Sequence, residues 1–523
     1  MGISLWDALA GLPLSNRIFF AVALAVAFGF EFINGFHDAA NAVTTVIYTR
    51  TLRPTAAVIY SGVLNFLGVL LGGTAVAFSI VNLLPVDLLI DGASVRAMVM
   101  VLSLLVAGMI WNLATWWYGL PVFSSHTLIG SILGVGLANS LLTRGDVQGV
   151  NWSKAGEVGL SLLISPILGF AAAAGLLLVM KRLVRDPRLY RPPDEGDEPP
   201  RWVRGMLLAT CGGVSLAHGS NDGQKGMGLI LLVLIGFLPT HYALDLNDPS
   251  RAKAVREAAI AIRDTLRQQQ PQSLTPAIRS DLDAVVADLE GKSSFVEVPP
   301  AERWEIRRAI YRLRKDLRQA GVDRALRDAI APHIRRLDEA IEYVPTWVIV
   351  AVALALGTGT TVGYKRIVVT VAEKIGKAHM SFAQGAVAEM VAALTIGLAD
   401  VVHMPVSTTQ VLSSGVAGTM WANRSGIRGE TVRSIGLAWA LTLPAATALS
   451  AAFFTVGGLL IPAAGPHRAA TAPAAAHTIG VRPGESPDTS RRRGGGIGDR
   501  SSAARRASGS ATGWRPSRHS FEC

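Results

Sequence analysis

Asparagine, aspartate and histidine side chains follow directly after one of the most apolar parts of the sequence. Residues 18–30 are almost entirely Ala, Val, Phe and Leu, and the segment NGFHDAANAVTTV occupies residues 34–46. Ionisable groups at membrane depth are costly to bury and usually serve a function. Carboxylate and amide oxygens suit a hard cation, and a carboxylate can also carry a proton. The pattern therefore predicts cation chemistry in this segment.

The same arrangement occurs a second time in the chain. Residues 217–230 read AHGSNDGQKGMGLI, so that Asp222 corresponds to Asp38 and Lys225 to Asn41. A further pair of similar segments follows, PVFSSHTLIG at 121–130 and PVSTTQVLSS at 405–414. Two similar sets of segments in the same order are typical of a transporter built from internal repeats.

Hydroxyl side chains follow a proline in both of these later segments. They precede apolar helical runs, which is the pattern of a helix N-terminus with hydroxyl caps. Two such half-helices would direct backbone N–H groups and hydroxyls at one anion, although such residues can also only cap a helix or pack between helices. The candidate anion ligands are Ser124, Ser125, Ser407, Thr408, Thr409, Lys225, His126 and Gln224.

Two aspartates beside an anion would repel it, so we expect a cation between them. Neutral amide oxygens suit sodium, whereas protonation of an aspartate would serve a proton-coupled cycle. The candidate residues for coupling to this cation are Asp38, Asn41, Asn34, Asn221 and Asp222. Lys225 lies one turn from Asp222 and could either neutralise it or contact the anion.

Three further ionisable residues could take part in proton transfer. Glu31 lies about two turns from Asp38, and His37 and His218 lie within the repeated segments. We take these three as candidates for a proton relay, while a single buried histidine is more often a packing residue. Glu389 could merely face a polar interior.

Composition indicates a polytopic membrane protein of the all-α class. Half of the residues are hydrophobic, only 17% are charged, and several apolar runs are long enough to cross a bilayer. The net charge of +11 lies in short loops and the C-terminal tail, so nucleic acid is not an expected partner. The two cysteines form no disulfide framework or metal cluster, and we expect no cofactor besides the coupling cation. The N-terminus lacks a basic region and a cleavage site, so no cleaved signal peptide is expected.

The apolar runs predict ten spans, five in each repeat. Basic loops after the first, fifth, seventh and ninth spans should be cytoplasmic, which makes the two repeats inverted. The first and sixth spans are long and carry glycines beside their polar residues, so we expect broken or strongly tilted helices there, with half-helices elsewhere. The predicted spans are 18–48, 55–81, 96–118, 121–142, 157–181, 204–239, 344–362, 380–402, 404–421 and 432–462.

The predicted domains follow from these spans. Segments 251–268 and 302–342 show helical periodicity, so residues 241–343 should form a small soluble helical insertion outside the cytoplasm. Residues 463–523 contain too few aliphatic side chains to bury a core, and we expect a disordered tail. The parts are a first membrane repeat at 1–181, a cytoplasmic linker at 182–203, a second repeat at 204–240 and 344–462, the insertion at 241–343, and the tail at 463–523.

The motifs resemble those of the inorganic phosphate transporter (PiT) family, and in particular its bacterial low-affinity branch. GFHDAANAV, HGSNDGQKG, PVFSSHTLIG and PVSTTQVLSSGVAGTM carry the resemblance, which extends over about residues 20–462. The resemblance implies a secondary transporter in the plasma (bacterial inner) membrane that carries phosphate with a cation, by similarity a proton in this branch and sodium in others. It also implies that the phosphate could travel as a neutral metal-phosphate complex, and a homodimer is a possible assembly.

Three positions depart from the family pattern. Gln410 stands where a histidine is common, Phe123 where a small residue is frequent, and Ser220 where alanine is more usual. Gln410 removes a titratable group, so a histidine at this position is not required for coupling. A transporter of sulfate or another oxyanion and an anion channel remain alternatives. An enzyme is not expected, because no nucleophile and base pair accompanies the hydroxyls.

Overall fold

The computed structural model describes residues 9–81, 95–121, 124–147, 150, 152–193, 199–401 and 406–460. Within the helices, a few side chains also lie outside the described part, and Asp38 and Asn41 are among them. Within the described ranges every named element is a helix, and one isolated bridge joins Gly376 to Ile427. The predicted all-α class is confirmed, while the tail at 463–523 lies outside the described residues.

The helices of the first half are α2 (Leu14–Tyr48), α3 (Pro54–Leu71), α4 (Ala75–Val81), α6 (Val95–Trp117), α7 (Ser124–Arg144), α8 (Trp152–Leu183) and η1 (Pro187–Leu189). The second half contains α9 (Arg201–Phe237), α10 (Pro239–Tyr242), α15 (Thr346–Thr360), α16 (Lys365–Val369), η4 (Thr370–Lys374), α17 (Phe382–Val401), α18 (Thr408–Ala422) and α19 (Gly429–Leu460). The insertion contains α11 (Arg251–Gln269), η2 (Pro271–Ser273), α12 (Pro276–Asp288), η3 (Phe295–Glu297), α13 (Pro300–Gln319) and α14 (Arg324–Ile341).

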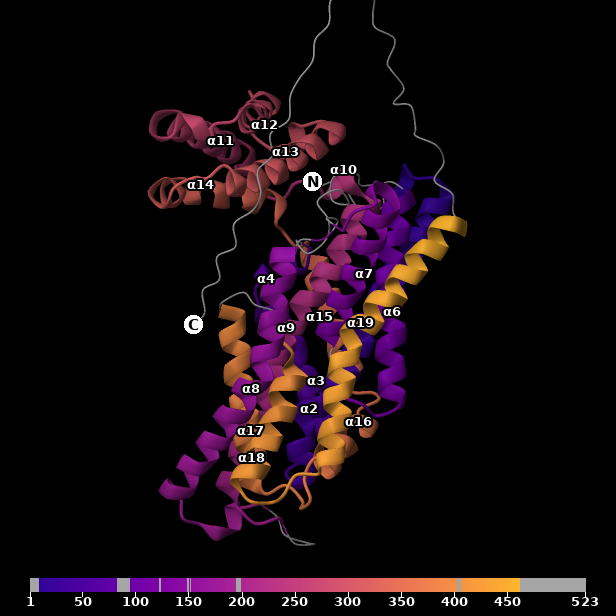
Figure 1. The fold of residues 1–523 in the computed structure, drawn as a ribbon, viewed down its shortest axis with the longest axis vertical. Helices are drawn as coiled ribbons and strands as arrows, with labels where there is room; N and C mark the ends of the chain where they lie inside the picture. Colours follow the sequence, from indigo (N-terminus) through magenta and orange to yellow (C-terminus); the bar gives the residue numbers. More distant parts are fainter. Residues whose placement is uncertain are drawn as a thin grey trace, which may run out of the picture. The chain divides into compact units, whose positions relative to one another are not determined.

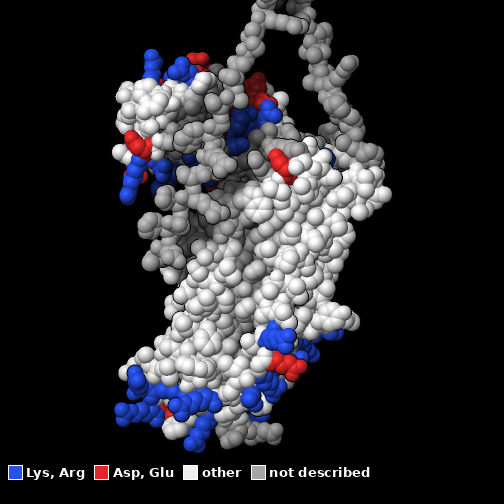
Figure 2. All heavy atoms as spheres, viewed as in Figure 1, with Lys and Arg blue, Asp and Glu red and all other residues white. Residues whose placement is uncertain are grey.

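Seven of the described helices are long and apolar enough to cross a membrane, and eight if the bent pair α14 and α15 is counted as one span. Each of the ten predicted spans overlaps a helix, but α15 and α18 have only 15 residues and α9 is too polar to qualify. The face of the helices in Figure 2 carries a broad zone without Lys, Arg, Asp or Glu. Large apolar side chains such as Leu163 and Leu441 are exposed, as expected next to lipid. The chain is a multi-pass membrane protein.

For the first and sixth spans we expected a broken or a strongly tilted helix; the break is wrong, and the tilt stays a prediction. α2 runs without interruption for 35 residues and α9 for 37. Their glycines instead allow other helices to approach closely, because a Cβ on Gly35 would lie 2.4 Å from the Leu356 oxygen and one on Gly219 would lie 2.2 Å from the Asn65 oxygen. The second predicted span is the one that is interrupted, between α3 and α4 at Gly72.

The close helix crossings occur in matching pairs. α2 crosses α15 at Gly35, and α9 crosses α3 at Gly219, which is the corresponding position of the second motif. α7 also packs along α19, and α8 along α18 (Figure 1). Here a Cβ on Gly134 would lie 2.1 Å from the Thr447 oxygen and one on Gly418 would lie 2.3 Å from the Phe170 oxygen. These paired contacts agree with a duplicated chain, and the inverted orientation of the two copies stays a prediction.

Four helices make up the insertion, α11 to α14 (Figure 1). The predicted helix at 251–268 corresponds to α11, whereas the predicted segment 302–342 is divided into α13 and α14 at Gly321, whose φ of 62° suits glycine. The buried Arg307 guanidinium donates to the carbonyl oxygens of Ala243 (2.8 Å) and Ile341 (3.0 Å). It thereby joins the two ends of the insertion.

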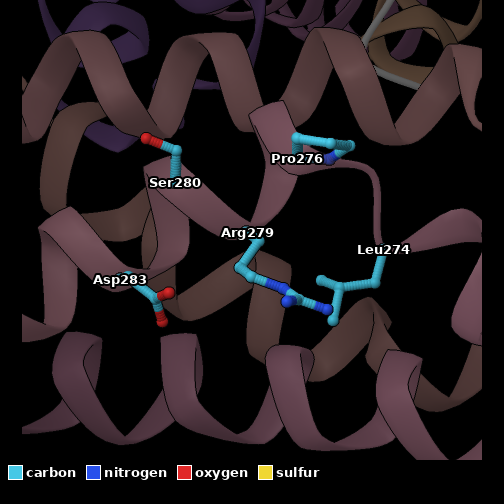
Figure 3. Close-up of a pocket in the computed structure, with 5 residues that line it drawn as sticks. All are labelled: Leu274, Pro276, Arg279, Ser280 and Asp283. Atoms are coloured by element: carbon cyan, nitrogen blue, oxygen red, sulfur yellow. The ribbon is translucent and has the colours of Figure 1, made fainter. Parts of the chain in front are cut away.

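The surface of the insertion has a pocket of about 320 Å³ beside α12 (Figure 3). Its lining residues are Leu274, Pro276, Arg279, Ser280 and Asp283. The Asp283 carboxylate accepts a hydrogen bond from Arg263 at 2.9 Å. None of the motifs singled out in the sequence contributes to this pocket, and the position of the insertion outside the cytoplasm stays a prediction.

Candidate functional site

The two hydroxyl motifs form helix N-termini, as predicted. α7 begins at Ser124, and α18 begins at Thr408. The Ser407 hydroxyl caps α18 by accepting a hydrogen bond from the Gln410 N–H at 3.2 Å. The hydroxyl residues at both starts are buried, namely Ser124, Ser125, Ser407, Thr408 and Thr409.

Lys225 joins these two helix starts. Its ammonium donates to the Ser125 hydroxyl at 2.7 Å and to the Val406 carbonyl at 2.9 Å. The Ser125 hydroxyl in turn donates to the same Val406 carbonyl at 3.4 Å. The structure therefore brings the start of α7, the residue preceding Ser407 and the second repeated motif to one place.

Asp222 is buried and surrounded by donors. Its carboxylate accepts from Lys225 at 2.6 Å and from the Asn34 amide at 3.4 Å, and the His218 Nε2 atom lies 3.3 Å away. A buried carboxylate needs an opposite charge and hydrogen bonds to offset its lost hydration. Lys225 supplies the charge. Its ammonium has three N–H groups, and each donates to a protein acceptor: Asp222, Ser125 or the Val406 carbonyl.

His218 connects Asp222 to α3. Its Nδ1 atom lies 2.9 Å from the side-chain oxygen Oδ1 of Asn65, and the Asn65 side-chain nitrogen donates to the Thr360 hydroxyl at 2.9 Å. Asn65 was not among the predicted site residues, because in the sequence it is one polar residue in a mostly apolar run.

Two amide oxygens of the repeated motifs are buried and have no hydrogen-bond partner within the described part of the chain. They are Oδ1 of Asn34 and Oδ1 of Asn221. Both amide nitrogens are engaged by carboxylates, since Asn34 donates to Asp222 at 3.4 Å and Asn221 donates to Asp400 at 2.6 Å. Asp400, on α17, was not among the predicted site residues. An acidic side chain in the apolar run 382–401 was the signal that could have identified it.

Glu31 is fully buried on α2 beside this cluster. Neither carboxyl oxygen has a hydrogen bond of normal geometry among the described residues, and the Asn34 side chain is a polar neighbour of this carboxyl group. The side chain lies against Gly226, where an added Cβ would be 2.3 Å from the Glu31 Cδ atom. Gly226 follows Lys225, so Glu31 lies next to the same stretch of α9.

Other predicted residues have contacts of their own. The Gln224 side-chain oxygen accepts from the Val76 N–H at 2.9 Å and so caps α4. The His37 Nε2 atom lies 3.5 Å from the Thr115 hydroxyl, and His126 is partly buried in the first turn of α7. The predictions for Asp38 and Asn41 concern side chains outside the described part.

Two residues of the second half of the chain also contact residues of the first half. Glu389, on α17, is fully buried and accepts from Thr210 at 2.6 Å and from Thr45. The Gln410 side-chain oxygen accepts from the Ser165 hydroxyl at 3.1 Å. Gln410, which replaces the histidine common in the family, therefore serves to join α18 to α8.

Comparisons with known proteins identify the family. The model of the phosphate transporter family matches residues 34–450. Two low-affinity inorganic phosphate transporters of Escherichia coli (strain K12) are each 40% identical: PitB, with 86% of this chain and 99% of the relative covered, and PitA, with 85% and 98% covered. A solved structure described as the sodium-dependent phosphate transporter has a TM-score of 0.48 and 19% identity, with 85% of this chain and 100% of that chain covered. The chain belongs to the phosphate transporter family.

Proposed function

We propose that the chain imports inorganic phosphate by symport with a cation, and that this cation is the proton. The main support for the proposal is the position of Lys225. Its ammonium joins two helix N-termini to the buried carboxylate of Asp222. A site for an anion and a site for a cation then lie on neighbouring side chains. Such an arrangement suits the binding of both in one state of a secondary transporter.

The phosphate site is proposed at the starts of α7 and α18. The first N–H groups of a helix have no partner within the helix, and their partial positive charge attracts anions. The hydroxyls of Ser124 and Thr408 would add hydrogen bonds, as would Ser125, Ser407, Thr409 and His126. Lys225 already donates to three protein acceptors, so it would act on phosphate mainly through its charge. A metal-phosphate complex would reduce the net charge to be carried.

Glu31 supports the choice of the proton. An ionised carboxylate that is fully buried near a second acid, Asp222, is very costly, and the neutral acid is the form that fits this position. Release of that proton would make Glu31 a second negative charge beside Asp222. The carboxyl group could therefore alternate between its two forms during a cycle, with Asp38, His37 and His218 as further members of the relay.

Sodium is the second candidate, and the amide oxygens favour it. Oδ1 of Asn34 and Oδ1 of Asn221 are buried acceptors with no partner among the described residues. Neutral oxygens of this kind are ligands for a hard cation, and Asp38 and Asn41 would complete the set. A cation held here would also offset the repulsion between the acids and phosphate.

Exchange measurements test the carrier and its anion. Vesicles preloaded with unlabelled phosphate should take up labelled phosphate faster than empty vesicles, because a carrier returns more quickly when loaded. Equal rates would indicate a channel. Excess external sulfate should leave the rate of labelled phosphate uptake unchanged, and inhibition by sulfate would show that the site accepts oxyanions in general.

The expected location is the bacterial inner membrane.

A further inference from the structure

Asp400 makes two hydrogen bonds to the second repeated motif. Its carboxylate accepts from the Asn221 amide nitrogen at 2.6 Å and from the Ser220 hydroxyl at 2.5 Å. It reaches these neighbours from α17, whereas both of them lie on α9. The contact is therefore a tertiary one between α17 and α9, and the repeated motif alone does not predict it.

The bond to Asp400 fixes which way the Asn221 amide faces. An ionised carboxylate only accepts hydrogen bonds, so it selects the nitrogen of an amide and turns the oxygen to the other side. Asn221 is fully buried, and its Oδ1 has no hydrogen-bond partner in the described residues. A buried acceptor without a donor is costly, which indicates that a ligand satisfies it in another state.

Asn34 shows the same arrangement with Asp222. Its nitrogen donates to Asp222, and its Oδ1 is buried without a partner among the described residues. Two carboxylates thus each hold one amide nitrogen and leave one amide oxygen available. A pair of acceptors that cannot donate suits a cation and disfavours the unprotonated oxygens of an anion.

The duplication of the chain does not account for Asp400. It lies five residues before Pro405, and the corresponding position before Pro121 is Trp116. Trp116 packs against Phe36 with ring centroids 5.1 Å apart and donates to the Gly363 carbonyl at 2.8 Å. The carboxylate therefore occurs in the second copy only.

We propose that Asp400 is a positioning residue that holds the Asn221 oxygen toward the coupling cation. This inference rests on the proposed symport and extends it to a residue that contacts neither substrate. The Asn221 oxygen can bind a small monovalent cation such as sodium, or accept a hydrogen bond from a proton donor such as a protonated water. Loss of the carboxylate allows the Asn221 amide to turn over and present its nitrogen to the cation.

Asp400→Asn is the test, because it preserves shape and removes the acceptor-only property. Uptake into vesicles containing the full chain is measured at varied sodium with fixed pH, and at varied external pH with fixed sodium. The half-saturating concentration of whichever cation drives the wild type should rise about tenfold, as expected for loss of one orienting hydrogen bond. The half-saturating phosphate concentration, measured at saturating cation, should change less than about twofold.

Two further variants separate positioning from simple helix attachment. Ser220→Ala removes the other hydrogen bond to Asp400 and leaves the Asn221 contact, so its cation dependence should match the wild type. Asp400→Glu retains an acceptor-only carboxylate and should recover part of the cation affinity lost in Asp400→Asn. All rates are normalised to the amount of protein in the vesicles.

Several results would overturn this role for Asp400. They are an unchanged cation dependence in Asp400→Asn, an equal shift in Ser220→Ala, no recovery in Asp400→Glu, or a rise confined to the phosphate half-saturation. A wild type that responds to neither cation would instead contradict the proposed symport itself. The two failures are thus distinguished within one set of measurements.

Discussion

The Lys225 ammonium lies 2.6 Å from the Asp222 carboxylate and 2.7 Å from the Ser125 hydroxyl. Removal of the lysine leaves a buried carboxylate without its counter-charge, which typically costs about 3–5 kcal/mol. Lys225→Gln should therefore lower the thermal stability of the purified protein in detergent. The double variant Lys225→Gln with Asp222→Asn removes both charges and should regain most of this stability without regaining transport. A double variant as unstable as the single one would show that the pair is not mutually compensating.

The hydroxyl groups at the two helix starts predict a second result. Ser124→Ala and Thr408→Ala should each raise the half-saturating phosphate concentration roughly tenfold to a hundredfold, since a hydrogen bond to a charged group contributes about 1.5–3 kcal/mol. Thr455→Ala is a suitable control, because among the described residues that hydroxyl donates only to the Ala451 carbonyl of its own helix. If both site variants retain the wild-type phosphate dependence, these hydroxyls are packing residues.

The helix starts were predictable from the sequence because their signals are local. A proline followed by hydroxyl residues marks the beginning of α18 wherever the rest of the chain lies. The role of Gly35 was not predictable in this way, because it depends on α15, which follows more than 300 residues later. Glycine beside polar residues suggests a break when read alone, and only the partner helix shows that it serves a close crossing.

The partners of the predicted site residues also depend on tertiary structure. Asp222 was selected from its motif, but its link through His218 to Asn65 joins residues of different repeats. Asp400 and Asn65 each lie in a helix that is mostly apolar. The general cost of burying such groups could have marked them as candidates, while their orientation and partners required the packed helices.

The crossing of α9 with α3 predicts a difference between two glycines of the same helix. A Cβ on Gly219 would lie 2.2 Å from the Asn65 carbonyl oxygen, whereas one on Gly205 would have no atom within 4 Å. Gly219→Ala should force the helices apart and lower the amount of folded protein in the membrane. Gly205→Ala should be neutral or slightly stabilising, because alanine favours a helix by about 1 kcal/mol. Equal yields of the two variants would contradict the close crossing.

Asp338 predicts a pH dependence for the insertion. Burial, with Glu342 nearby, raises the pKa of the Asp338 carboxyl to about 7, although Arg314 opposes the shift. The folded insertion therefore holds this proton at pH values where the unfolded chain, with an ordinary aspartate pKa, has released it. Stability contributed by the proton is present at low pH and is lost as the pH rises to about 7, by at most about 1.4 kcal/mol per pH unit.

Hydrogen exchange of the intact protein measures this effect. Amide protons of α14 should be less protected at pH 8 than at pH 5, after correction for the intrinsic pH dependence of exchange. Asp338→Asn removes the titrating group and should make the corrected protection nearly independent of pH. A variant with the wild-type pH dependence would assign the effect to another residue.

Phosphate accumulation in vesicles with separately imposed gradients tests the central claim most directly. The purified full chain is reconstituted, and labelled phosphate is followed with a pH gradient, acid outside, in the absence of sodium, and then with an inward sodium gradient at equal pH. The proposed proton symport predicts accumulation above the external concentration with the pH gradient and simple equilibration with the sodium gradient. Accumulation with sodium alone would replace the proton by sodium, and equilibration under both gradients would contradict cation-coupled phosphate transport.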